Sequence, residues 1–241
     1  MAYDTNSPYA RSGAGVRAEP VDAGLRSYML SVYNYMALAL VITGLMAFVV
    51  ASTPAIYGPI FSSPLKWVVM LAPLGFVLAL SFGIQKMSVG TAQIVFWTYA
   101  ATMGLSLSVI FLAFTAESIA RTFFITAAAF GALSLYGYTT KRDLTAMGSF
   151  LIMGVFGLII ASVVNIFLGS TALQFAVSVL GVLIFAGLTA YDTQRIKSMY
   201  FEVRSDGTAM SKAALMGALA LYLDFINLFM FLLQFMGQQR N

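Results

Sequence analysis

The chain alternates between long apolar runs and short breaks that are polar or contain proline or glycine. Seven of the runs have the length, about 20 helical residues, that crosses a hydrocarbon core roughly 30 Å thick. They lie at about 28–51, 65–85, 91–114, 119–138, 147–168, 171–191 and 213–235. The pattern predicts an all-α polytopic membrane protein with seven transmembrane helices.

The breaks between the runs indicate one membrane domain with a short segment at each end. Residues 1–26 are polar and small, and we expect them to form a mobile cytoplasmic tail. We expect residues 27–237 to form a single transmembrane domain, and residues 238–241 a short C-terminal tail. No charged region leads directly into an apolar run with a cleavage site, so the first run is expected to stay as an anchor. Only the sixth connection, from Asp192 to Lys212, is long, and it holds most of the loop charge.

Lysine and arginine are distributed unevenly between the two sides of this predicted domain. On the side of the N-terminus lie Arg11, Arg17, Arg26, Lys86, Lys141, Arg142, Arg195, Lys197, Arg204 and Lys212, and on the other side lie Lys66, Arg121 and Arg240. Because positively charged loops stay in the cytoplasm, we predict a cytoplasmic N-terminus and a C-terminus on the opposite side. If the last run were re-entrant instead, the C-terminus would return to the inside.

The composition narrows the chemistry that this chain can perform. Hydrophobic residues make up 60% of the chain and charged residues 9%, and there is no cysteine and no histidine. Disulfides, thiolate metal sites, haem ligation by histidine and imidazole proton relays are therefore excluded. No soluble-type catalytic set or glycine-rich phosphate loop is present, so we expect no enzymatic activity and no cofactor. The net charge of +4 comes from short loops between apolar runs, which favours membrane orientation over nucleic-acid binding.

The last apolar run carries a carboxylate, Asp224, near its middle. An ionisable residue deep in a membrane helix costs several kcal/mol by insertion scales, so it usually faces a partner or a water-filled path. Helical spacings of three, four or seven place it on one face with Ala213, Gly217, Ala220, Asn227 and Gln234. That face is expected to pack against other helices, with Asn227 as a hydrogen-bonding packing residue.

Asp192 is the natural candidate for a partner, since it ends the sixth run on the side from which the seventh begins. By nominal helical rise the two aspartates differ in depth by about 15 Å. They can meet only if the sixth helix continues toward Lys197 and the seventh starts nearer Leu215. Two carboxyls in contact at low dielectric cannot both stay ionised, so they would share a proton. Deprotonated, they would attract a hard cation such as Ca²⁺.

Two alternatives remain at this point. Asp192 could be an interfacial cap, and Asp224 a structural residue satisfied by hydrogen bonds. An aspartyl intramembrane protease also needs two buried aspartates on neighbouring spans. Tyr191-Asp192 looks like the YD motif of those enzymes, but Tyr222-Leu223-Asp224 lacks the glycines of their GxGD motif, which disfavours this reading.

Three motifs give the chain a family resemblance. They are Gly187 to Lys197 (GLTAYDTQRIK), Ala220 to Phe229 (ALYLDFINLF) and, more loosely, Gly137 to Thr145 (GYTTKRDLT). In these motifs and in the number of spans the chain resembles the Bax inhibitor-1 family, also called the transmembrane Bax inhibitor motif or lifeguard family. The resemblance implies six spans around a central seventh and a pH-sensitive leak of Ca²⁺. It assigns pH sensing and transient calcium contact to Asp192 and Asp224, with Tyr191 and Asn227 in support.

The resemblance carries three further expectations. Some members have a basic residue on the second span that locks one aspartate, and Lys86 at the end of that span is the nearest base here. The compact cysteine-free chain looks like a bacterial inner-membrane member. Members are also linked to other membrane proteins, including quality-control proteases, so a non-conducting membrane modulator is the alternative function. The expected partners are the lipid bilayer, calcium ions and protons, and in the alternative other membrane proteins.

Overall fold

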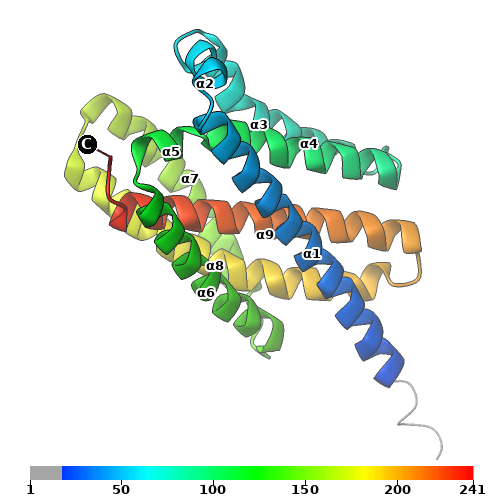
Figure 1. Cartoon of the computed structure of the whole chain (residues 1–241). Coiled ribbons are helices and arrows are strands. Elements are labelled where there is room, and N and C mark those ends of the chain that lie inside the picture. Colours follow the sequence, from blue (N-terminus) through cyan, green and yellow to red (C-terminus); the bar gives the residue numbers. More distant parts are fainter. Residues whose placement is uncertain (1–17, 241) are drawn as a thin grey trace, which may run out of the picture.

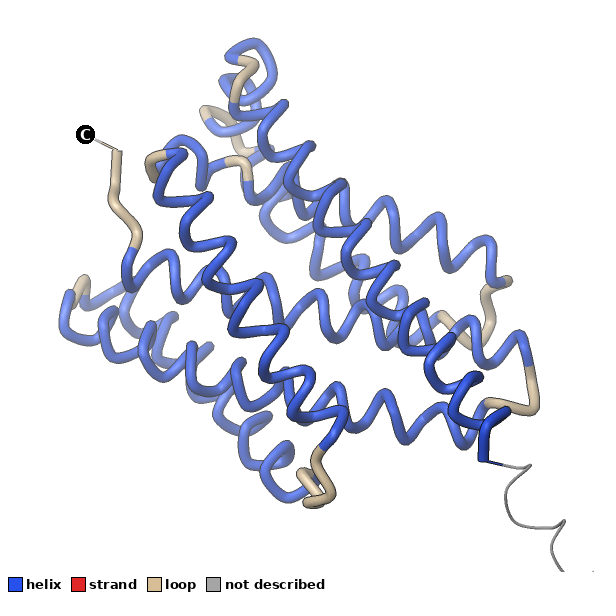
Figure 2. The backbone as a smooth tube through the Cα atoms, turned by 60° about the horizontal axis from the view of Figure 1, so that its bottom comes forward, coloured by secondary structure: helices blue, strands red, loops and turns tan. Residues whose placement is uncertain are grey.

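The computed structural model describes residues 18–240. In this part of the chain all named secondary-structure elements are helices (Figures 1 and 2). The helices are α1 (Ala18–Ala51), α2 (Pro54–Phe61), α3 (Leu65–Gly83), α4 (Val89–Leu107), α5 (Val109–Ala113), α6 (Ala116–Thr139), α7 (Thr145–Leu168), α8 (Thr171–Val203) and α9 (Gly207–Met236). Seven membrane-length apolar helical segments lie within the described residues, which confirms the predicted fold class.

Two short helices, α2 and α5, were not predicted from the hydrophobic pattern. The segment expected to be a proline-rich break forms α2, because Pro54 stands at the start of the helix, where a missing N–H costs nothing. The third span is divided into α4 and α5 at Ser108. The Ser108 hydroxyl donates to the carbonyl of Leu105 at 2.7 Å, and this local bond accompanies the change of helix.

The sixth connection is much shorter than predicted. The expected long loop from Asp192 to Lys212 is wrong, because α8 continues to Val203 and α9 begins at Gly207. The carboxylate of Asp206 accepts bonds from the N–H groups of Thr208 and Ala209, which caps α9 and fixes its start. Charged residues that were counted as loop therefore lie on helical faces, and both helices extend beyond their apolar runs.

α9 is the central helix of the bundle (Figure 1). It packs directly against α8, α1, α6 and α4, and 61% of its most apolar 18-residue stretch is buried. α3 packs on α4 and α7 packs on α8, so these two helices complete the ring from outside. A cavity of about 660 Å³ separates α3 and α7 from α9. The fold expected from the family resemblance, with six spans around the seventh, is thus present.

The two ends of the described chain lie at opposite ends of the bundle (Figure 1). The helix α1 starts at Ala18, inside the segment predicted as a tail, and residues 1–17 of that segment lie outside the described residues. After α9 the backbone pairs with the connection between α5 and α6: Thr115 N–H donates to Gln238 at 3.1 Å, and Arg240 N–H donates to Ala113 at 2.9 Å. These bonds hold the predicted C-terminal tail against the bundle.

Candidate functional site

Asp192 and Asp224 face each other between α8 and α9. Asp224 is 4% exposed, and Asp192 is partly buried. The two carboxyls lie within hydrogen-bonding range of each other, and Asp192 is the charged group that acts on Asp224. The Oδ2 atom of Asp224 has no hydrogen-bond donor among the described residues. Since two carboxylates have no donor between them, one shared proton is what allows them to bond.

The register between α8 and α9 brings the two aspartates together. A Cβ added at Gly217 of α9 would lie 3.1 Å from Ile196 of α8, and one added at Gly181 of α8 would lie 2.5 Å from the ring of Phe231 of α9. These glycines let the helices approach closely at two points. Asp192 lies one turn before Ile196, and Asp224 lies two turns after Gly217, so both share the contact face. The first part of the condition set from sequence is met, because α8 continues past Lys197 to Val203. The second part is wrong, because α9 begins at Gly207 and not nearer Leu215.

A chain of hydroxyl groups borders Asp192. The hydroxyls of Tyr33 (α1) and Ser134 (α6) are 2.5 Å apart, and those of Ser134 and Thr193 (α8) are 2.9 Å apart. The Thr193 hydroxyl donates to the carbonyl of Thr189 at 2.8 Å. Each hydroxyl has one proton, so Ser134 donates to Thr193 and Tyr33 donates to Ser134. The chain ties α1 and α6 to the residue next to Asp192.

A second hydroxyl chain borders Asp224. The Thr43 hydroxyl of α1 donates to the carbonyl of Ala100 in α4 at 2.8 Å, and it lies 2.7 Å from the Tyr222 hydroxyl of α9. Because the single Thr43 proton is used on Ala100, Tyr222 donates to Thr43. The ring of Tyr222 lies edge-on against Tyr99, with centroids 5.4 Å apart. The turn of α9 that carries Asp224 is thereby fixed to α1 and α4.

The motif from Gly187 to Lys197 connects α8 to its other neighbours. The Gln194 side chain accepts from Leu144 N–H at 2.9 Å and donates to the Arg142 carbonyl at 2.8 Å, which holds the connection between α6 and α7. The Lys197 ammonium donates to the Tyr138 carbonyl at 2.8 Å and lies 4.8 Å from the centre of its ring. Polar residues that looked like loop charges therefore satisfy the exposed backbone at the end of α6.

The supporting residues named from sequence lie around the pair rather than in it. The ring of Tyr191 packs on Gly148 of α7 and so points away from α9. The Asn227 amide donates to the Leu223 carbonyl at 2.8 Å, in its own helix, and its side chain lines the cavity beside α3 and α7. Lys86 lies exposed in the connection between α3 and α4. The cation whose charge acts on Asp192 is Arg195, one turn along α8.

Two cavities approach the pair from opposite ends of the bundle. One, of about 360 Å³, opens at the N-terminal end and is lined by Tyr191 and Arg195, which flank Asp192. The other is the cavity of about 660 Å³ beside α3 and α7, lined by Leu223 and Asn227, which flank Asp224. Neither Asp192 nor Asp224 lines a cavity itself, so each cavity reaches only residues that flank the pair.

The metal chemistry available to the pair is that of two carboxylates. Calcium takes six to eight oxygen ligands in a resident site. No group of three or more acidic side chains occurs among the described residues. The arrangement here therefore fits brief contact with a passing cation, supplemented by water, better than a resident ion.

Sequence reasoning missed the hydroxyl residues and recovered the carboxylates. Ser134, Thr193, Thr43 and Tyr222 are buried polar side chains that bridge different helices. Thr193 and Tyr222 stand one and two positions from the aspartates inside the two motifs, and this adjacency was the available signal. Ser134 and Thr43 gave none, because single hydroxyls in membrane helices usually bond their own backbone.

Comparison with known proteins places this fold among bacterial relatives. A model of the family described as "Inhibitor of apoptosis-promoting Bax1" matches residues 25–241. The chain is 53% identical over 220 residues to an uncharacterized protein of Rickettsia prowazekii, covering 91% of this chain and 93% of that one. It is 51% identical to an uncharacterized protein of Caulobacter vibrioides, with 99% of each chain covered. It is 46% identical to the inner membrane protein YbhL of Escherichia coli, with 90% of this chain and 94% of YbhL covered.

Proposed function

The chain belongs to the Bax inhibitor-1 family, and from this premise we propose that it is a pH-sensitive calcium leak gated by the protonation of Asp192 and Asp224. The observation that carries the proposal is the juxtaposition of these two carboxyls in the interior of the bundle, between α8 and α9. By analogy with YbhL we place the protein in a bacterial inner membrane. From the distribution of lysine and arginine we place the N-terminus in the cytoplasm and the C-terminus on the opposite side.

In this mechanism the closed state is the one with a shared proton. One proton between the carboxyls makes a charge-assisted hydrogen bond and holds α8 against α9. When the proton leaves, two negative charges face each other in a site of low dielectric and repel. The helices then separate at this level, water enters, and the paired carboxylates attract Ca²⁺. Flux should therefore rise with pH.

The surrounding charges favour a slow leak over a fast channel. The mouth of the cavity at the N-terminal end carries Lys141, Arg142 and Arg195, and its only acidic lining residue is Asp143. A cluster of like charges lowers the local concentration of cations and slows their entry. The cavity at the other end is mostly apolar, with Ser106, Ser162 and Asn227 as its polar lining. Neither side concentrates calcium, so only the aspartate pair offers it favourable ligands.

The test is Ca²⁺ entry into dye-loaded proteoliposomes from mildly acid to mildly alkaline pH. We compare the native chain with Asp192→Asn and Asp224→Asn. Native flux should increase with pH, and each substitution should flatten the profile, because one remaining carboxyl cannot alternate between a shared proton and mutual repulsion. Glu202→Gln is the matched control, since it removes an exposed acid from the same helix α8 and should leave the pH profile as it is.

Two outcomes would contradict the leak. An unchanged pH profile in both aspartate variants would remove the pair from gating. Flux no greater than that of empty liposomes, from protein whose folding is verified by its melting transition, would favour the alternative function. That alternative is a non-conducting modulator of other membrane proteins, for which neither aspartate needs to titrate.

A further inference from the structure

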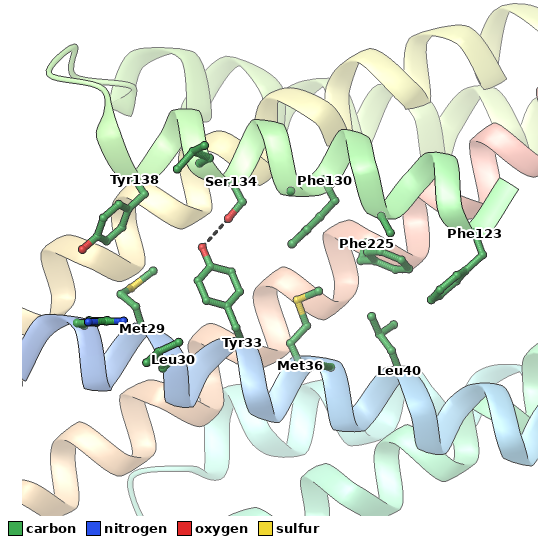
Figure 3. A pocket seen from close by; sticks show the side chains of 15 residues that line it. Met29, Leu30, Tyr33, Met36, Leu40, Phe123, Phe130, Ser134, Tyr138 and Phe225 are labelled. Atoms are coloured by element: carbon green, nitrogen blue, oxygen red, sulfur yellow. Dashed lines mark hydrogen bonds between the residues drawn. The ribbon is translucent and has the colours of Figure 1, made fainter. Parts of the chain in front are cut away.

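A cavity of about 700 Å³ lies between α1 and α6 (Figure 3). These two helices both pack on α9 but make no extended contact with each other. Side chains of α1 and α6 point toward one another across the gap, with Phe225 of α9 behind them. The lining is apolar for most of its length: Met29, Leu30, Met36, Ala37, Leu40, Phe123, Ala127, Phe130, Gly131, Leu135 and Phe225.

This α1–α6 cavity opens to the lipid. Leu30 and Leu135 at its rim are 51% and 63% exposed, within helices of membrane-spanning length. A second cavity of about 320 Å³ follows it between the same helices and shares Leu40, Phe123 and Phe225 with it. The first cavity extends along α1 from Arg26 to Leu40, which is about 21 Å of helix by nominal rise. That length matches one leaflet including its headgroup region, which is about half of a bilayer roughly 40–45 Å thick.

The end of the cavity nearest the N-terminal side is polar and basic. Arg26 is exposed and lines the cavity there, together with Tyr138. Lys197 binds the Tyr138 carbonyl and covers its ring, so a second cation borders the same end. The lining residues include no acidic side chain. The cavity therefore joins a basic, hydrogen-bonding end to a mostly apolar slot that faces the membrane. The hydrogen bond between Tyr33 and Ser134 is its one polar crossing from α1 to α6 among the lining residues (Figure 3).

We propose that the α1–α6 cavity holds one acyl chain of an anionic phospholipid from the leaflet on the N-terminal side, with its phosphate at Arg26. Apolar lining and openness to lipid select a hydrocarbon chain over water or a soluble ligand. Basic positions between membrane helices at the headgroup level select an anionic headgroup. The binding does not depend on calcium flux or on the aspartate pair.

The test places a single tryptophan at the cavity mouth and measures quenching by brominated lipids. Trp67 and Trp97, the chain's two tryptophans, are first replaced by phenylalanine. Leu135→Trp then reports the mouth, and Phe150→Trp reports an exposed position on α7 at a similar depth from the same end. In mixed vesicles, brominated phosphatidylglycerol should quench the Leu135 reporter several-fold more than brominated phosphatidylcholine does. It should show no preference at the Phe150 reporter.

Two variants separate the headgroup from the chain. Arg26→Gln should abolish the preference for phosphatidylglycerol, whereas Arg204→Gln, at an exposed arginine on the same side but outside the cavity, should keep it. Gly131→Phe should fill the slot and reduce quenching by both lipids, because open space surrounds the position of its Cβ. Gly157→Phe, at an equally open glycine on α7, is the control and should change nothing.

Three results would overturn the proposal. Equal quenching of the Leu135 reporter by both lipids would reduce the cavity to ordinary contact with bulk lipid. A preference for phosphatidylglycerol that persists in Arg26→Gln would show that Arg26 does not bind the headgroup. Loss of quenching as the protein-to-lipid ratio rises would mean that a second copy of the chain, and not a lipid, covers the cavity.

Discussion

The helix α6 has two seams that use the same residue type in opposite ways. Toward α8, a Cβ at Gly137 would collide with the backbone carbonyl of Ala190, so the two helices touch through their main chains. Toward α1, the Cβ position of Gly131, six residues earlier, meets nothing within 4 Å. The first seam carries the hydroxyl chain and borders the aspartate pair, and the second opens to lipid. A small residue in a membrane helix can therefore mark either the closest approach or an open slot.

The largest difference between the two seams is expected when one methyl group is added to each. Gly137→Ala forces α6 and α8 apart, and such overpacking typically costs about 1–3 kcal/mol. Gly131→Ala meets no neighbour and gains helix propensity, up to about 1 kcal/mol. Thermal unfolding of the purified protein in detergent should show a clearly lower melting temperature for the first variant only. Equal melting temperatures would mean that the α6–α8 contact yields without cost.

Ser134 tests the boundary between the two seams, since its hydroxyl connects Tyr33 of α1 to Thr193 of α8. Ser134→Ala leaves the Tyr33 hydroxyl without its acceptor and should lower the unfolding free energy by roughly 0.5–1.5 kcal/mol. The control is Ser149→Ala, whose exposed hydroxyl bonds only the Thr145 carbonyl in its own helix. If both variants melt alike, the hydroxyl chain does not hold the seams together.

The smallest expected effect lies outside the membrane, at Asp143 in the connection between α6 and α7. Hydrogen bonds from the side chain and the backbone N–H of Thr145 hold the pKa of this exposed carboxyl below its ordinary value. A lowered pKa in the folded state contributes stability above the unfolded pKa, near 3.9, and that contribution is lost as the pH falls through the folded pKa. Asp143→Asn should thus melt slightly earlier than the native chain at neutral pH. The difference should vanish in strong acid, and a difference that is constant with pH would rule out the carboxylate as its source.

The sequence was sufficient for the number of spans, and it singled out the two aspartates, whose role stays a prediction. Apolar runs report membrane crossing directly, and a buried carboxylate in such a run stands out by its cost. The length of α8 was missed because Arg195 and Lys197 resemble loop charges in a linear pattern. In the fold, Lys197 caps the carbonyl of Tyr138, and Arg195 acts on Asp192.

What the sequence left open depends on contacts between helices that are far apart in the chain. The approach of Asp192 to Asp224 requires the register set at Gly217 and Ile196, and no local pattern encodes that register. The same holds for the α1–α6 cavity. The Cβ position of Gly131 faces open space, whereas that of Gly137, in the same helix, meets the backbone of Ala190. The sequence alone does not distinguish these two glycines.

The central position of α9 has a consequence for how the protein is made. Synthesis proceeds from the N-terminus, so the helix around which the bundle is built leaves the ribosome after the six that surround it. Those six helices are therefore in the bilayer before the central position is occupied by α9. Asp224 would enter hydrocarbon at considerable cost if α9 were inserted alone. Only three residues, Arg204 to Asp206, join α8 to α9, so the two helices can enter as one hairpin in which Asp192 already accompanies Asp224.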